Sequence, residues 1–197
     1  MQQRRAVWFE AQPILDVETI RERARSQLQD GAVTPSYGAD RDVVLRLLNE
    51  ALATEIVSVL SYKRQYFLAK TLGSPSLIAT LQEYAAQDQQ HADRLAERIV
   101  QLGGEPDFAP TGLTQRSHAE YGAGSQLVEI VRDALITERV AVESYREMIR
   151  FIGDGDPTTR RLLEDLLAVQ EGHARNLLSL VEEVSLYEAS RTLRCIA

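Results

Sequence analysis

Four long segments of the chain repeat their apolar residues at steps of three and four, which is the period of an α-helix. They run from about residue 40 to 72, from 75 to 102, from 125 to 152 and from 157 to 184. The 197 residues include only 6 prolines and 11 glycines, set against long runs rich in Leu, Ala, Glu and Arg. The sequence therefore predicts an all-α fold.

The breaks between the segments predict how the helices connect. Gly73 ends the first segment, and Ser74 and Pro75 suit the N-cap and first position of the next helix. The motif "GDGDP" separates the third segment from the fourth, whereas about twenty residues after Gly103 separate the second from the third. Two short loops and one long crossover are typical of a four-helix bundle. A helical repeat is the alternative, but no period of 20–50 residues recurs.

Residues 1–40 and 185–197 fall outside the predicted bundle of residues 41–184. Within the N-terminal extension, "LDVETIRERARSQLQDG" is compatible with one amphipathic helix that runs past Leu28 to a C-cap at Gly31. We expect Trp8 and Phe9 to anchor this extension on its own bundle or on a neighbouring subunit. The short tail is long enough for a small fifth helix.

The composition and charge argue against several classes of protein. A net charge of -7 argues against a general nucleic-acid binder, and the extension adds no cationic tail because residues 1–30 hold five Arg and five acidic residues. Cys195 is the only cysteine, which excludes an intrachain disulfide and fits a reducing cytoplasm. The first 16 residues lack the uninterrupted apolar core typical of a signal peptide, and no segment approaches the run of about 18 apolar residues of a membrane span. We expect a soluble, cytoplasmic protein.

Polar side chains interrupt the apolar face of every predicted bundle helix near its middle. An unpaired buried carboxylate is costly, so four such interruptions at matching depth indicate a shared metal site. Two of the three histidines of the chain take part, while His118 is expected to be an ordinary loop residue. The interrupting residues are Glu55 in the first helix, Asp88 and His91 in the second, Glu138 in the third, and Gln170 and His173 in the fourth.

The spacing of these residues suits a pair of metal ions. Asp88 and His91, like Gln170 and His173, are three positions apart, which points both side chains to one side of a helix. One carboxylate from each of two helices and an acid-x-x-His pair from each of the other two form the di-iron carboxylate arrangement. Carboxylate and imidazole ligands suit iron, manganese and zinc rather than copper(I).

At these residues the chain resembles the ferritin-like superfamily, and within it bacterioferritin and the Dps-like ferritins. The motifs "LNEALATEIVSVLSY", "HADRLAERIVQLGGEPD" and "EGH" at 171–173 carry the resemblance, which covers about residues 41–184. It implies that Glu55 and His91 bind one metal, that Glu138 and His173 bind the other, and that these four residues carry the reaction. It also places Tyr62 next to the metal ligands. The position of the haem-ligand methionine is Gln89, so no such haem is expected.

Two positions depart from the family pattern. The resemblance implies bridging glutamates where this chain has Asp88 and Gln170. A neutral amide bridges two metal ions poorly, and Asp is one methylene shorter than Glu. Glu171 lies about 100° around the helix from Gln170 and is expected to face away from the site. The sequence therefore predicts a weakened, asymmetric or partly occupied site.

The resemblance implies an iron-binding protein that acts as a ferroxidase, using peroxide or oxygen, and that stores iron in a homo-oligomeric shell. Such a role would connect the protein to oxidative stress. Shells of 12 and 24 subunits both remain open. Two alternatives are a manganese-catalase-like enzyme that removes peroxide and a ferritin-like scaffold that binds no metal. The substitutions at Asp88 and Gln170 are the reason for keeping the scaffold alternative.

Overall fold

The structure is a computed structural model that describes the backbone of residues 14–196 and the side chains of residues 14–186. Trp8 and Phe9 lie outside the described residues. The chain divides into two compact units, with the boundary between Tyr37 and Gly38. All regular secondary structure in residues 14–196 is helical, which confirms the predicted all-α class. No helix in this range is long and apolar enough to cross a membrane.

The N-terminal unit contains helix α1 (Val17–Arg25), which is shorter than the helix expected from the sequence. Asp16 caps its start by accepting a hydrogen bond from the backbone N–H of Thr19 at 3.1 Å. The helix ends because the Ser26 backbone is extended and the Ser26 hydroxyl donates a hydrogen bond to the Arg23 carbonyl at 2.9 Å. A separate 3-10 turn, η1 (Leu28–Asp30), follows. The expectation of one continuous helix through Leu28 was therefore wrong.

Helices α2 (Arg41–Leu72) and α3 (Pro75–Gln101) form the first hairpin of the bundle. Asp40 caps α2 by accepting hydrogen bonds from the next backbone N–H groups. Gly73 ends α2 in the left-handed conformation, with φ of 75°, which favours glycine. Ser74 occupies the N-cap position of α3 and Pro75 its first turn, as predicted, although the Ser74 side chain makes no capping hydrogen bond.

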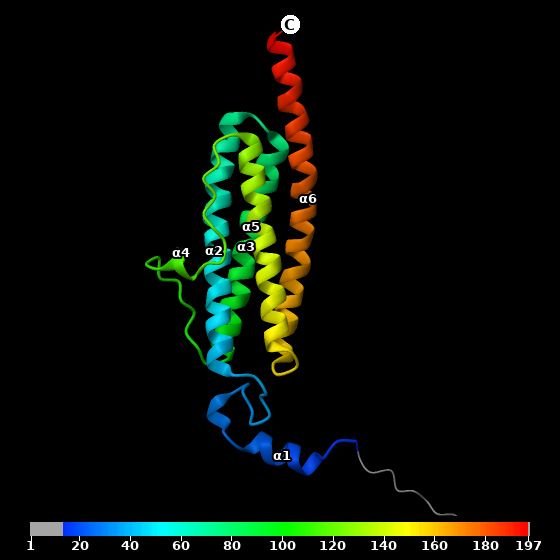
Figure 1. The fold of residues 1–197 in the computed structure, drawn as a ribbon. Coiled ribbons are helices and arrows are strands. Elements are labelled where there is room, and N and C mark those ends of the chain that lie inside the picture. The colour runs from blue at the N-terminus through cyan, green and yellow to red at the C-terminus, as the bar shows by residue number, and fades with distance from the viewer. Residues whose placement is uncertain (1–13, 197) are drawn as a thin grey trace, which may run out of the picture. The chain divides into compact units, whose positions relative to one another are not determined.

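Helices α5 (Leu127–Ile152) and α6 (Pro157–Ile196) form the second hairpin. A capping box between Gln126 and Glu129 sets the start of α5, so this helix begins two residues later than the predicted Ser125. Helix α6 continues without a break past Val184, and its last turns extend beyond the other three helices (Figure 1). The C-terminal tail is thus a continuation of α6 and not a separate fifth helix.

The four long helices lie side by side as a bundle (Figure 1). Helix α2 packs against α3 and α5, and α6 packs against α5 and α3. Residues 103–126 form the crossover, which runs along the bundle and contains the one-turn helix α4 (Leu113–Arg116). This connectivity confirms the predicted four-helix bundle with one long crossover. The predicted apolar faces form its core, and on α3 and α5 every residue of those faces is buried.

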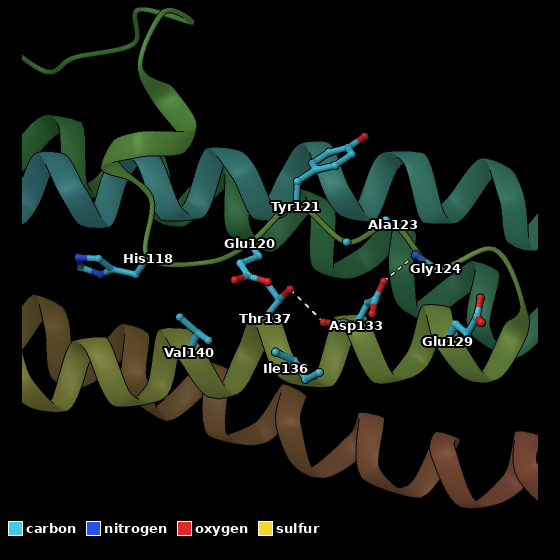
Figure 2. Close-up of a pocket in the computed structure, with 11 residues that line it drawn as sticks. His118, Glu120, Tyr121, Ala123, Gly124, Glu129, Asp133, Ile136, Thr137 and Val140 are labelled. Carbon is cyan, nitrogen blue, oxygen red and sulfur yellow. Dashed lines mark hydrogen bonds between the residues drawn. The ribbon is translucent and has the colours of Figure 1, made fainter.

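The crossover and α5 enclose a surface groove of about 730 Å³ (Figure 2). The Asp133 carboxylate on α5 accepts a hydrogen bond from the Gly124 N–H at 2.7 Å and so ties the end of the crossover to the bundle. His118 lines this groove, and its Nε2 lies 3.5 Å from Glu50 Oε2. None of the six predicted metal ligands lines the groove, so the candidate site lies elsewhere.

Candidate metal centre

The six predicted ligands meet in the interior of the bundle, and all four long helices contribute. Each is at most 5% exposed. The i, i+3 spacing turns Asp88 and His91 inward from α3, and the same spacing turns Gln170 and His173 inward from α6. Glu55 reaches the same space from α2, and Glu138 reaches it from α5. The structure therefore brings together every residue singled out for this site.

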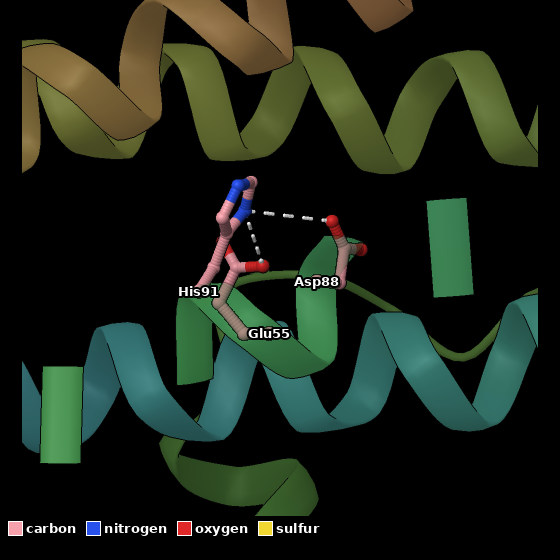
Figure 3. Close-up of side chains that lie close together, drawn as sticks. All are labelled: Glu55, Asp88 and His91. Atoms are coloured by element: carbon pink, nitrogen blue, oxygen red, sulfur yellow. Dashed lines mark ion pairs between the residues drawn. The ribbon is translucent and has the colours of Figure 1, made fainter. Parts of the chain in front are cut away.

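Glu55, Asp88 and His91 form the first group of candidate ligands (Figure 3). The Nδ1 atom of His91 lies 3.4 Å from Glu55 Oε2 and 3.7 Å from Asp88 Oδ1. The three residues offer ligand atoms that all lie within 4.8 Å of one another. One nitrogen and two carboxylate oxygens at this separation can bind one divalent cation.

Asp88, Glu138 and His173 form the second group, whose ligand atoms also lie within 4.8 Å of one another. His173 again presents its Nδ1 atom, which lies 3.2 Å from Glu138 Oε1. Asp88 belongs to both groups. Its side chain thus lies within reach of both groups, although a side chain one methylene shorter than Glu was expected to reach only one ion.

Gln170 joins the carboxylates by hydrogen bonds. Its Nε2 atom donates to Glu55 Oε1 at 3.2 Å and to Asp88 Oδ1 at 3.4 Å. The amide NH2 cannot bind a cation, and the amide oxygen Oε1 is buried without a hydrogen-bond partner. Gln170 therefore links the two groups of ligands as a neutral hydrogen-bond donor.

Two buried tyrosines each donate a hydrogen bond to the glutamate of the neighbouring helix. Tyr62 on α2 donates to Glu138 Oε1 at 2.6 Å, and Tyr145 on α5 donates to Glu55 Oε1. Tyr62 was expected beside the ligands from the family resemblance, whereas no role was predicted for Tyr145. A signal was present, because each tyrosine follows the glutamate of its own helix by seven positions. Each phenol occupies one oxygen of its glutamate and leaves the other oxygen for a cation.

Burial and mutual repulsion favour the protonated forms of Asp88 and Glu138. The pKa of Asp88 is raised well above its usual range, first by burial and then by the charges of Glu55 and Glu138. Burial also raises the pKa of Glu138, and its contact with His173 opposes that rise. The pKa of Tyr62 and that of Tyr145 are raised mainly by burial, so both phenols keep their protons. Divalent cations would offset the carboxylate charge gathered here.

Unsatisfied buried atoms test whether the site fits a metal. Buried polar atoms in proteins nearly always have hydrogen-bond partners. Here five of the six site residues each have one buried polar atom without such a partner. Three of these atoms are carboxylate oxygens and one is an imidazole nitrogen, which are common metal ligands. The five atoms are Glu55 Oε2, Asp88 Oδ2, His91 Nδ1, Glu138 Oε2 and Gln170 Oε1. The donor set therefore fits two divalent cations of the iron, manganese or zinc type.

Glu171 and Gln89, which are next to candidate ligands in the sequence, lie outside this cluster. Glu171 is exposed and pairs with Arg146 at 2.7 Å, which agrees with the expectation that it faces away from the site. Gln89 is also exposed and donates a hydrogen bond to Asp93 at 3.0 Å. Tyr84 and Gln87, which were not predicted to belong to the site, contact the His173 ring.

Four helices that direct carboxylate, amide and imidazole groups into one buried centre define the class of dinuclear carboxylate four-helix bundles. The sequence profile of the ferritin-like domain matches residues 45–187. The chain therefore belongs to the ferritin family.

Individual relatives agree with this assignment. A bacterioferritin from Brucella melitensis is 31% identical over 132 residues, which cover 66% of this chain and 77% of the relative. A bacterioferritin from Desulfovibrio desulfuricans is 27% identical over 131 residues, covering 66% of this chain and 69% of the relative.

Solved structures show the same fold. The bacterioferritin-related protein of Bacteroides fragilis, a dodecameric thioferritin, has a TM-score of 0.72 at 23% identity and covers 78% of this chain and 92% of its own. The bacterioferritin of Rhodobacter capsulatus has a TM-score of 0.66 at 25% identity, and the match covers 77% of this chain and 88% of the bacterioferritin chain. That structure has a metal-free dinuclear site and haem iron.

Proposed function

We propose that this protein binds ferrous iron at the buried centre, oxidises it with peroxide or oxygen, and sequesters the product. The observation that carries the proposal is the buried group of three carboxylates and two histidines with unsatisfied ligand atoms, in a chain of the ferritin family. Two ferrous ions give up two electrons, which together with two protons reduce one peroxide to two waters. Two adjacent cation positions suit this stoichiometry.

The protein side chains have distinct roles in this proposal. Glu55 with His91, and Glu138 with His173, hold one ferrous ion each, and Asp88 contacts both. The six site residues are at most 5% exposed, so the carboxylate charges are screened less than they would be at the protein surface. Tyr62 and Tyr145 fix the orientation of the two glutamates from outside the group of ligands.

We further propose that the site is weakened relative to one with four carboxylates. Two ferrous ions bring four positive charges, whereas Glu55, Asp88 and Glu138 supply at most three negative ones. The Gln170 amide directs its NH2 toward Glu55 and Asp88, so it presents a neutral donor to these carboxylates where a glutamate would add negative charge. Unequal occupancy and slow oxidation follow from this arrangement.

A ferritin-like scaffold that binds no metal is the second candidate function. The hydrogen bonds from Gln170 to Glu55 and Asp88 favour it, because they give two buried carboxylates a partner without a cation. A manganese-catalase-like activity uses the same donor types, so the identity of the bound metal separates it from iron oxidation.

The family assignment also supports a homo-oligomer, and we propose a closed shell of 12 or 24 subunits in the cytoplasm that limits oxidative stress. Two large apolar side chains of α2 are consistent with contacts between subunits, because Leu60 is 48% exposed and Phe67 is 64% exposed. The Gln89 side chain at the position expected for a haem ligand leads us to propose that no haem binds there.

Elemental analysis of the purified protein, followed by aerobic titration with ferrous iron, tests the proposal. We expect bound iron and an oxidation rate above that of iron in buffer. The variant His173→Ala should lose most of this rate, whereas His118→Ala, which removes a histidine of the crossover, should keep it. Manganese with catalase activity would favour the first alternative. Absence of any bound transition metal, with no oxidation, would favour the scaffold.

A further inference from the structure

The imidazole of His173 is held on two sides by residues of α3 that are not themselves metal ligands. Its Nε2 atom is hydrogen-bonded to Gln87 Oε1. The ring of Tyr84 stacks on the imidazole, with ring centroids 3.7 Å apart and planes inclined by 14°. On its third side, Nδ1 faces Glu138 Oε1 at 3.2 Å. These contacts leave the ring little freedom to rotate.

Glu83 determines which end of the Gln87 amide faces His173. The Nε2 atom of Gln87 donates to Glu83 Oε1 at 3.1 Å, one helical turn earlier on α3. A carboxylate can only accept, so the NH2 group must face Glu83 and the amide oxygen must face the imidazole. The oxygen in turn accepts the Nε2–H of His173. Nδ1 is then the nitrogen whose lone pair is available beside Glu138.

The other histidine of the site lacks this support. His91 Nδ1 lies 3.4 Å from Glu55 Oε2, but among residues 14–186 no hydrogen bond to the His91 ring is found. No aromatic ring stacks on it in this part of the chain either. The two halves of the site therefore hold equivalent ligands with different preorganisation.

We propose that Gln87, oriented by Glu83 and assisted by the Tyr84 ring, is a positioning residue that makes the Glu138–His173 pair the tighter of the two cation positions. This inference rests on the proposed function, because it requires that the centre binds divalent cations. A ligand fixed in its bound orientation loses less conformational freedom on binding. Residues that orient a metal-binding histidine change metal affinity by about ten- to a hundredfold when they are replaced.

Cobalt(II) is the probe, because it binds such sites without being oxidised by air and is located by its anomalous scattering. Crystals of the full chain equilibrated with increasing cobalt give the occupancy at each position, and the dissociation constants come from titration in solution. We expect the Glu138–His173 position of the wild type to fill at the lower cobalt concentration. Gln87→Leu removes the acceptor and should weaken this position by about ten- to a hundredfold.

Two variants serve as controls. Gln87→Glu keeps an oxygen acceptor and should restore binding at the Glu138–His173 position. Gln82→Leu makes the same change at an exposed position of α3 and should have no effect. Thermal unfolding checks that each variant is folded.

The outcomes separate this inference from the proposed function. Equal affinity of the wild type for cobalt at both positions would overturn the role of Gln87. So would an affinity of Gln87→Leu for cobalt that equals that of the wild type. Neither result would contradict the metal centre itself. Equal weakening of both positions by Gln87→Leu would also overturn the role of Gln87, because the effect would then be a general loss of structure. A wild type that binds no cobalt and no iron rejects the proposed function itself.

Discussion

The amide nitrogen of Gln170 lies 3.2 Å from Oε1 of Glu55 and donates a hydrogen bond to it across the middle of the bundle. The same nitrogen contacts Asp88 Oδ1 at 3.4 Å. A hydrogen-bond donor thus stands between two carboxylates at a position where a fourth carboxylate would add charge for the cations. This relationship is the physical basis for our proposal that the site binds metal weakly.

Gln170→Glu should strengthen the site. Glu has nearly the same shape as Gln and supplies a fourth negative charge, so we expect tighter binding of ferrous iron and faster aerobic oxidation. Adding Asp88→Glu should raise both further and non-additively, because the two residues act on the same pair of ions. In the metal-free protein, the extra buried carboxylate should lower the melting temperature. Unchanged iron content and rate in Gln170→Glu would show that residue 170 is not part of a metal site.

The protonation of Asp88 predicts how the metal-free protein responds to pH. The pKa of this carboxyl in the folded protein is raised well above the 3.8 of an ordinary Asp, by burial and by Glu55 and Glu138. The folded chain therefore holds this proton to a higher pH than the unfolded chain does. The resulting stability is fully present below the unfolded pKa and is lost as the pH rises through the folded pKa.

Chemical unfolding of metal-free protein at a series of pH values measures this effect. From about pH 4 towards neutral pH, the wild type should lose stability relative to Asp88→Asn, which cannot ionise. Metal affinity should change in the opposite direction, because a bound cation must displace the Asp88 proton and so binds better at higher pH. A stability difference between the two proteins that does not vary with pH would contradict the assignment.

Tyr145→Phe tests the second of the two tyrosine contacts. The change removes the phenol that donates to Glu55 Oε1 and leaves a buried carboxylate oxygen with one donor fewer. We expect a loss of about 1–3 kcal/mol in the free energy of unfolding, measured on metal-free protein. Tyr121→Phe, which alters an exposed tyrosine of the crossover, is the matched control and should be neutral. An equally neutral Tyr145→Phe would remove Tyr145 from the site.

The exposed apolar residues of α2 predict contacts between subunits. Replacing Leu60 and Phe67 together by Asp should convert the assembly into smaller species, because charges would be buried at the interface. Light scattering gives the mass, and circular dichroism checks that the helices remain. A wild-type protein that is already a 22.1 kDa monomer at micromolar concentration would rule out the storage shell.

Deletion of residues 1–30 tests the N-terminal extension. Val17 and Ile20 on α1 are both about half exposed, which suits contacts with other protein surfaces. We expect the deletion to disturb assembly more than iron binding, because all the candidate ligands lie between Glu55 and His173. Native mass spectrometry and metal analysis measure the two properties. Lost iron with an intact assembly would show that the extension serves the metal site.

The sequence predicted those parts of the molecule that depend on local signals. Gly73, Pro75 and Pro157 mark helix ends in the chain itself, and the bundle helices begin close to the predicted positions, although α6 runs well past its predicted end at Val184. The apolar period also identified the buried polar residues, because only one side of each helix can face the core. The six candidate ligands were therefore found without any knowledge of how the helices pack.

The remaining features depend on contacts between helices or on weak local preferences. The contact of Tyr145 with Glu55 and that of Gln87 with His173 join different helices, so they follow from the register of the packed bundle and not from the period of one helix. The early end of α1 at Ser26 depends on a side-chain bond to its own backbone, which competes with a continued helix.

Anaerobic titration of the metal-free protein with ferrous iron tests the central claim most directly. We expect up to two ions per chain with unequal affinities, and a loss of binding in Glu138→Gln, which removes a carboxylate charge while keeping the side-chain shape. Ferrous iron that fails to bind the wild type, or that binds Glu138→Gln equally well, would contradict a metal centre formed by Glu55, Asp88, His91, Glu138 and His173.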